Sequence, residues 1–255
     1  MKSFHVALVV AILGSSGSVF ADNISSGSSG VGFQTFGTPN ENGTPFWDQQ
    51  SMDGSHKNIG YLVNSEYGSL LPYWGKSDGK FDKSFSFTRG ASSGDVSGLL
   101  KIEIAGYHNL NEVGWYEVGN TSNKNTIWSG SDGAGVDALF NPTTNWGLYI
   151  ISPGGTFYSE SGYNTGTNDD KKNQHFAVFL ESPLANYGDG YEKYYIGVED
   201  LKLANSGIEK SGDYNDFVFT IQSAPEVGGG DIPEPASLSV LGLGAAALLI
   251  RRRKA

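Results

Sequence analysis

The segments 195-YIGVED-200 and 213-DYNDFVFTI-221 decide the fold, because each places a strand-like apolar run beside acidic residues. In the second segment Phe217, Phe219 and Ile221 occupy alternate positions, which is the period of a strand with one buried face. The apolar part of the first segment has the length of a short strand. If the two strands pair, their acidic ends lie at the same edge of one sheet.

The same two-residue period recurs along the chain, and glycine-rich turns separate the segments that carry it. The composition agrees, since 36 of 255 residues are glycine and aromatic residues make up 13%. Between the two termini there is no sustained helical period. We predict an all-β fold, an antiparallel β-sandwich that is jelly-roll-like. The alternating apolar sets are Leu100, Ile102 and Ile104; Trp146, Leu148 and Ile150; and Phe176, Val178 and Leu180.

The N-terminal residues have the parts of a secretory signal. Lys2 supplies the positive charge and residues 4–13 supply the apolar core. A glycine- and serine-rich stretch follows at residues 14–18 and would break a buried helix directly after that core. We predict a signal helix within residues 1–21, which signal peptidase removes by cutting between Ala21 and Asp22.

The C-terminal residues combine a short motif, an apolar run and a basic end. The motif is Pro233, Glu234 and Pro235, the run covers residues 236–250, and the end is Arg251, Arg252, Arg253 and Lys254. As a helix the run measures roughly 22 Å, against about 30 Å of bilayer hydrocarbon. Basic residues resist translocation, so we predict a hydrophobic helix whose basic end stays cytoplasmic. Its length suits a sorting tail at residues 232–255 better than the alternative, a lasting membrane anchor.

This order of motif, helix and basic end resembles the PEP-CTERM sorting signal. The resemblance implies recognition and cleavage by an exosortase, an integral-membrane transpeptidase-like enzyme of Gram-negative bacteria that also make exopolysaccharide. It implies that the chain is held transiently at the inner membrane and then reaches the cell surface or the extracellular space. Signal peptidase and exosortase are therefore the expected processing partners.

Between its termini the chain divides into a leader, one domain and a linker. We expect a flexible leader at residues 22–45, a β-sandwich domain at residues 46–224 and a linker at residues 225–231. The net charge of −10 argues against nucleic acid or anionic lipid as a partner. Cysteine is absent, so the exported domain gains no stability from disulfides.

Five oxygen-bearing residues at the expected sheet edge form a candidate metal site. They are Glu199, Asp200, Asp213, Asn215 and Asp216. Carboxylate and amide oxygens are the ligands that a hard cation such as calcium prefers. Aspartate and asparagine also favour turns that hold no metal, so the residues alone leave a metal-free turn open.

Six segments of the domain carry a second pattern: FWDQQSMDGSHKNIGYLV, AGYHNLNEVGWYEVG, NWGLYIISPGGTFYSES, QHFAVFLES, YYIGVEDL and GDYNDFVFTI. Together they resemble a domain of unknown function that recurs in PEP-CTERM and other bacterial surface proteins and ends in an E-D-L…D-Y-N-D-x-V-F signature. The resemblance covers most of residues 46–222 and, through the acidic motif, implies bound calcium. Gly212 stands where an acidic residue often precedes the D-Y-N-D, so we expect weak affinity.

No catalytic motif stands out in the sequence. The histidines that remain after signal removal, His56, His108 and His175, form no metal-binding pair, and we expect His175 to be a satisfied surface or edge residue of a strand. Neither a G-x-S-x-G elbow nor a phosphate-binding loop occurs. We predict that the protein is not an enzyme, with a glycan-active hydrolase that uses paired carboxylates as an alternative.

The aromatic residues suggest another alternative, a carbohydrate-binding module for exopolysaccharide. Trp115 and Trp146 lie in predicted strands, whereas Trp47, Trp74 and Trp128 adjoin turns and are expected to be more exposed. The whole sequence favours an exported, exosortase-processed protein of the cell surface, extracellular matrix or biofilm. Its domain is expected to be non-catalytic, calcium-stabilised and structural or adhesive.

Overall fold

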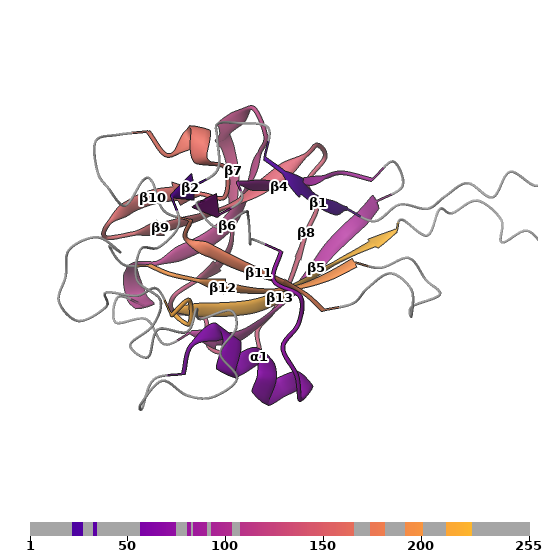
Figure 1. The fold of residues 1–255 in the computed structure, drawn as a ribbon. Helices are drawn as coiled ribbons and strands as arrows, with labels where there is room; N and C mark the ends of the chain where they lie inside the picture. Colours follow the sequence, from indigo (N-terminus) through magenta and orange to yellow (C-terminus); the bar gives the residue numbers. More distant parts are fainter. Residues whose placement is uncertain are drawn as a thin grey trace, which may run out of the picture. The chain divides into compact units, whose positions relative to one another are not determined.

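The computed structural model describes residues 22–27, 33–34, 57–74, 81–82, 84–90, 93–103, 108–165, 174–181, 192–200 and 213–225 (Figure 1). The predicted signal helix and sorting tail lie outside them. Among the described residues, no helix is long and apolar enough to cross a membrane.

The strands are β1 (Asn23–Ser26), β2 (Phe33–Gln34), β3 (Phe81–Asp82), β4 (Phe85–Thr88), β5 (Ser93–Glu103), β6 (Glu112–Glu117), β7 (Asn120–Ser129), β8 (Asp137–Phe140), β9 (Trp146–Ser152), β10 (Gly155–Tyr158), β11 (Phe176–Leu180), β12 (Glu192–Val198) and β13 (Phe217–Pro225). The helices are α1 (Ile59–Tyr67) and the short 3₁₀ turns η2 (His108–Leu110) and η3 (Ser161–Tyr163).

Two antiparallel sheets face each other across a shared core (Figure 1). The first sheet has the strand order β1-β4-β9-β6-β7, with β10 paired to β9. The second has the order β11-β12-β13-β5-β8, and β2 and β3 form a small separate pair. Aromatic and aliphatic side chains from both sheets fill the space between them. The predicted antiparallel β-sandwich is therefore confirmed.

The predicted alternation holds along β9, β11 and β13. Each of these strands presents every second side chain to the core, as a strand with one face on the sandwich interior must. The core-facing residues are Trp146, Leu148 and Ile150 of β9, Phe176 and Val178 of β11, and Phe217, Phe219 and Ile221 of β13.

Strand β5 departs from the predicted alternation. Leu100 pairs with Phe219 of β13 while Ile102 pairs with Val218, so Lys101 is an extra residue in the ladder. Such a bulge changes the face toward which the following side chains point. Leu100 therefore packs in the sandwich core, whereas Ile102 packs on the outer face of the sheet.

Helix α1 packs on the outer face of the second sheet, and the sequence pattern does not predict it (Figure 1). Asn58 caps its start by accepting a hydrogen bond from the N–H of Tyr61, and Gly68 ends it in the left-handed conformation with φ 72°. Ile59 and Val63 are buried against the sheet. With 9 residues the helix is too short to produce a sustained period.

Gly197 of β12 allows α1 to approach the sheet closely. A Cβ atom at this position would lie 2.3 Å from the carbonyl oxygen of Tyr214 and 2.8 Å from Cδ1 of Ile59. Any side chain here would therefore push apart the sheet, the helix and the turn before β13. This close approach places the start of α1 beside that turn.

Trp128 is more buried than the sequence predicts. Trp115 and Trp146 lie in the core, as expected. Trp128, which adjoins a turn, is only 1% exposed, so its expected exposure is wrong. The reason is Gly98 on β5, where a Cβ atom would lie 2.6 Å from the indole of Trp128. The glycine leaves a slot that the ring fills.

Residues 22–27 belong to the sandwich, although the sequence suggests a flexible leader for them. β1 pairs with β4, and Asp22 just before it is fully buried. The Asp22 carboxylate accepts hydrogen bonds from Arg89 Nη1 and Trp146 Nε1, both at 2.9 Å, and from Gly90 N at 3.0 Å. The guanidinium group compensates a carboxylate that has been removed from water.

The same segment also contacts the second sheet. The N–H of Asp22 donates to Ser223 Oγ at 2.9 Å, and the N–H of Ile24 donates to Tyr194 OH at 3.0 Å. Ser223 lies on β13 and Tyr194 lies on β12. The segment from Asp22 to β1 therefore ties the two sheets together at this end of the β12–β13 pair.

Replacing Arg89 with methionine should lower the free energy of unfolding by about 3 kcal/mol, because the buried Asp22 carboxylate would lose its guanidinium partner. Denaturant unfolding followed by tryptophan fluorescence measures this loss. The matched control is Lys101→Met, whose ion-pair partner Glu66 has a 36% exposed side chain. The control should cost less than about 1 kcal/mol. Equal losses in the two variants would contradict the role given to Asp22.

Candidate metal centre

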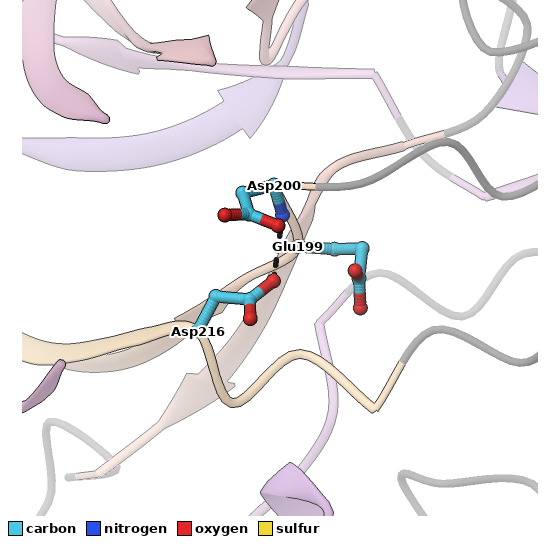
Figure 2. Close-up of side chains that lie close together, drawn as sticks. All are labelled: Glu199, Asp200 and Asp216. Carbon is cyan, nitrogen blue, oxygen red and sulfur yellow. Dashed lines mark hydrogen bonds between the residues drawn. The ribbon is translucent and has the colours of Figure 1, made fainter. Parts of the chain in front are cut away.

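The register of β12 and β13 brings acidic residues from both strands together. Val198, the last residue of β12, pairs with Phe217, the first residue of β13. Glu199 and Asp200 follow the first strand and Asp216 precedes the second, so all three lie at one sheet edge, as the sequence suggests. Figure 2 shows these side chains, which offer carboxylate oxygens within 4.8 Å of one another.

The three carboxylates are removed from solvent. The exposed fractions are 1% for Glu199, 0% for Asp200 and 8% for Asp216. The N–H of Asp200 donates to Asp216 Oδ2 at 2.7 Å, and the N–H of Tyr214 donates to Glu199 Oε2 at 3.4 Å. Asp200 Oδ1 is buried without a hydrogen-bond partner among the described residues.

Asn111 is a further polar residue at the site, and the sequence does not predict it. It directly precedes β6 and is 1% exposed. Its Nδ2 donates to Asp200 Oδ2 at 2.5 Å, while its Oδ1 has no hydrogen-bond partner in the described part of the chain. The two residues lie 89 positions apart in the sequence, so no local motif links them.

Asp213 and Asn215, the other two predicted ligands, bond elsewhere. Asn215 Nδ2 donates to Asp213 Oδ2 at 2.8 Å and to the carbonyl oxygen of Lys57 at 2.6 Å. The carbonyl oxygen of Asp213 accepts from the N–H of Ile59 at 2.9 Å. These bonds tie the turn to the start of α1. The structure therefore brings three of the five predicted ligands together and places these two against the helix.

Tyr214 lies between Asp213 and Asn215 in the D-Y-N-D turn. Its φ of 54° is in the left-handed region, which is uncommon for a residue with a side chain. The ring is fully buried, and the hydroxyl donates to the carbonyl oxygen of Gln174 at 2.6 Å. The side chains of Asp213 and Asn215, on either side of this left-handed residue, bond to each other, and Asp216 beyond them joins the acidic cluster.

His175 is buried, although the sequence suggests a surface or edge position. It is 1% exposed, and its Nδ1 donates to the carbonyl oxygen of Glu199 at 2.8 Å. Its ring stacks on Phe157 with centroids 3.8 Å apart. The hydrogen bond holds the backbone just after β12, and the stacking fixes the ring against β10.

Burial and repulsion act together on the pair Asp200 and Asp216. Burial, together with the negative charge of Asp200, raises the pKa of Asp216 to about 8. Burial also raises the pKa of Asp200. Neither residue has an ion pair with lysine or arginine among the described residues. Without a cation, the pair therefore retains a proton at neutral pH.

The donor atoms of the cluster are all oxygens. Carboxylates and an amide suit a hard cation such as calcium, whereas structural zinc sites use cysteine and histidine. A divalent cation would replace the shared proton, compensate the buried negative charge and occupy the lone pairs of Asp200 Oδ1. The residues present therefore fit a calcium ion.

Comparison with known protein families identifies the sorting signal. The PEP-CTERM protein-sorting motif matches residues 231–254, which include Pro233–Pro235 and the basic residues Arg251–Arg253. The chain is thus an exported protein targeted to exosortase and to the cell surface or extracellular space. The match does not test the second resemblance, over residues 46–222, which stays a prediction. No curated protein and no solved structure matches the chain.

In the presence of a chelator, the wild-type protein should lose stability relative to Asp216→Asn as the pH rises from about 4 to about 8. Folded Asp216 holds its proton up to a pKa of about 8, whereas the unfolded chain releases it near about 4. The folded state thus binds more protons in this window, and its stability falls by up to about 5 kcal/mol. Denaturant unfolding at several pH values measures the difference, and parallel profiles for the two proteins would contradict it.

Proposed function

We propose that this exported chain is a structural or adhesive protein of the cell surface or extracellular matrix, with a non-catalytic β-sandwich that binds calcium. The observation that carries the proposal is the sorting motif at residues 231–254, because it assigns the chain to the exosortase route. On this proposal the host is a Gram-negative bacterium, and the chain is held at the inner membrane until the tail is cut. The matrix is then the exopolysaccharide layer of a biofilm.

Calcium binding is supported by the acidic cluster of Glu199, Asp200 and Asp216. A buried carboxylate costs free energy unless a charge or hydrogen bonds compensate it. Asp22 is compensated by Arg89. Asp200 and Asp216 have no such partner in the described part of the chain. Extracellular calcium modules bind at about 10⁻⁴–10⁻³ M, and Gly212 in place of an acidic residue favours such weak affinity.

A structural role is supported by the contacts of His175 and by the burial of the described tryptophans. The His175 ring is stacked on Phe157 and bonded to the backbone, which is a packing arrangement. The indoles of Trp115, Trp128 and Trp146 are buried and offer no platform for a sugar ring. Trp74 is half-buried against the core, and Trp47 lies outside the described residues. The described indoles therefore favour a structural domain over a carbohydrate-binding module.

Replacing Pro233, Glu234 and Pro235 with alanine should abolish cleavage of the tail in a host that has an exosortase, because the change removes the recognition motif. The uncut variant should stay in the membrane fraction with its full C-terminal mass. Cell fractionation with intact-mass spectrometry measures both properties. The wild-type chain in a strain without the exosortase is the control and should behave like the variant. Normal cleavage of the variant would rule out this processing route.

Millimolar calcium should raise the Tm of the purified wild-type protein relative to chelator, and Asp200→Asn should lose most of that rise. A ligand that binds only the folded state stabilises it by about 0.4–1.4 kcal/mol at about 1–10 times its Kd, which is the range that millimolar calcium reaches for a site of this affinity. Thermal unfolding measures the shift. Asp137→Asn, which changes an exposed carboxylate on β8, is the matched control and should keep the full shift. An unchanged wild-type Tm would refute the calcium part of the proposal and leave the sorting part standing.

A further inference from the structure

Asn111 reaches the acidic cluster from the opposite sheet. It directly precedes β6, which pairs with β7 and β9 in the first sheet. Glu199, Asp200 and Asp216 flank β12 and β13, which pair in the second sheet. The hydrogen bond from Asn111 Nδ2 to Asp200 Oδ2 therefore connects the two sheets at this end of the sandwich.

The two residues that make this connection are only partly satisfied. Asn111 Oδ1 and Asp200 Oδ1 are both buried without a hydrogen-bond partner among the described residues. A buried polar atom without a partner costs about 1–3 kcal/mol. Both atoms carry lone pairs that either a hydrogen-bond donor or a cation can satisfy, but only a positively charged ligand that accepts electron pairs also compensates the three buried carboxylates. A hard cation meets this requirement.

We propose that Asn111 Oδ1 is a ligand of the cation held by Glu199, Asp200 and Asp216, and that the bound ion links the two sheets of the sandwich. The inference rests on the calcium site proposed above. It adds a ligand that lies outside the E-D-L…D-Y-N-D signature and comes from the other sheet.

The backbone at Asn111 is held where this role requires it. Its carbonyl oxygen accepts from the N–H of Gly130 at 2.8 Å, and the next residue, Glu112, pairs with Ile151 of β9. Rotation of the amide exchanges the positions of Nδ2 and Oδ1 without moving the strand, so that the hydrogen bond to Asp200 is replaced by an oxygen that faces the cluster. A neutral amide also adds a ligand without adding to the repulsion between the carboxylates.

This link lies at the end of the β12–β13 pair opposite to Asp22. At the Asp22 end, hydrogen bonds to Ser223 and Tyr194 join the sheets without any ion. At the Asn111 end, the strength of the connection depends on the calcium concentration. Removal of calcium should therefore loosen the contact between the start of β6 and the ends of β12 and β13 before the sandwich unfolds as a whole.

Calorimetric titration of the purified protein with calcium chloride tests the ligand. Asn111→Ala should bind calcium about tenfold more weakly than the wild type or worse, because affinity follows the number and charge of the ligands. Asn111→Asp, which restores an oxygen, should bind more tightly than Asn111→Ala. Asn125→Ala, which changes an exposed asparagine of β7, should match the wild type. Unchanged affinity in folded Asn111→Ala overturns the inference while the calcium site itself stands.

Amide hydrogen exchange of the wild-type protein tests the link without relying on a variant that must fold. Calcium should slow exchange at residues 112–115 of the first sheet as well as at residues 198–200 and 216–218 of the second. Slowing confined to the second sheet overturns the inter-sheet link. An absence of calcium binding by the wild type would instead overturn the site on which the inference rests.

Discussion

The antiparallel pairing of β12 with β13 is the interaction on which the described domain depends. One face of the pair closes the sandwich core and the other face receives α1, so both faces are apolar. A register shift of one residue would exchange core-facing side chains with helix-facing ones, which both layers oppose. The same register sets Val198 opposite Phe217 and thereby decides which side chains meet at the acidic end. The register of β12 and β13 therefore determines both the packing of these layers and the residues that form the candidate site.

The two ends of this pair compensate buried charge in different ways. Asp22 lies at one end and is neutralised by Arg89, a group of the chain itself. At the other end the pKa values of Asp200 and Asp216 are raised, so a bound proton neutralises one of the two carboxylates. A proton cancels one charge, whereas a divalent cation cancels two and accepts several oxygen ligands at once. The stability of this end is therefore linked to pH and, on the proposed function, to the calcium concentration as well.

Local pattern predicts those parts of the structure that depend on neighbours in the sequence. The strands β9, β11 and β13 follow from a two-residue period, and the meeting of Glu199, Asp200 and Asp216 follows from the pairing of two strand ends. Features that depend on residues distant in the sequence cannot be predicted from this local pattern. The bulge at Lys101 depends on β13, the burial of Trp128 depends on Gly98, and α1 is stabilised by a sheet that it meets only in the folded chain.

The ligands of the candidate site are likewise predicted only where they follow from neighbours in the sequence. Residue type assigned Asp213 and Asn215 to a metal, yet they bond to each other and to the segment at the start of α1, while Asn111 arrives from the other sheet.

The absence of cysteine makes a cation between the sheets especially useful to an exported domain. Secreted domains commonly join distant segments with disulfides, which this chain lacks. A calcium ion bound by Asn111 and the acidic cluster would make a comparable link reversibly. With a Kd of about 10⁻⁴ M or weaker, such a site stays empty at the calcium concentrations of the cytosol and fills outside the cell. The last ordering of the sandwich would then follow translocation, when the chain no longer has to remain unfolded in order to cross the membrane. The acidic cluster would in this way time the folding of the domain to the export of the chain.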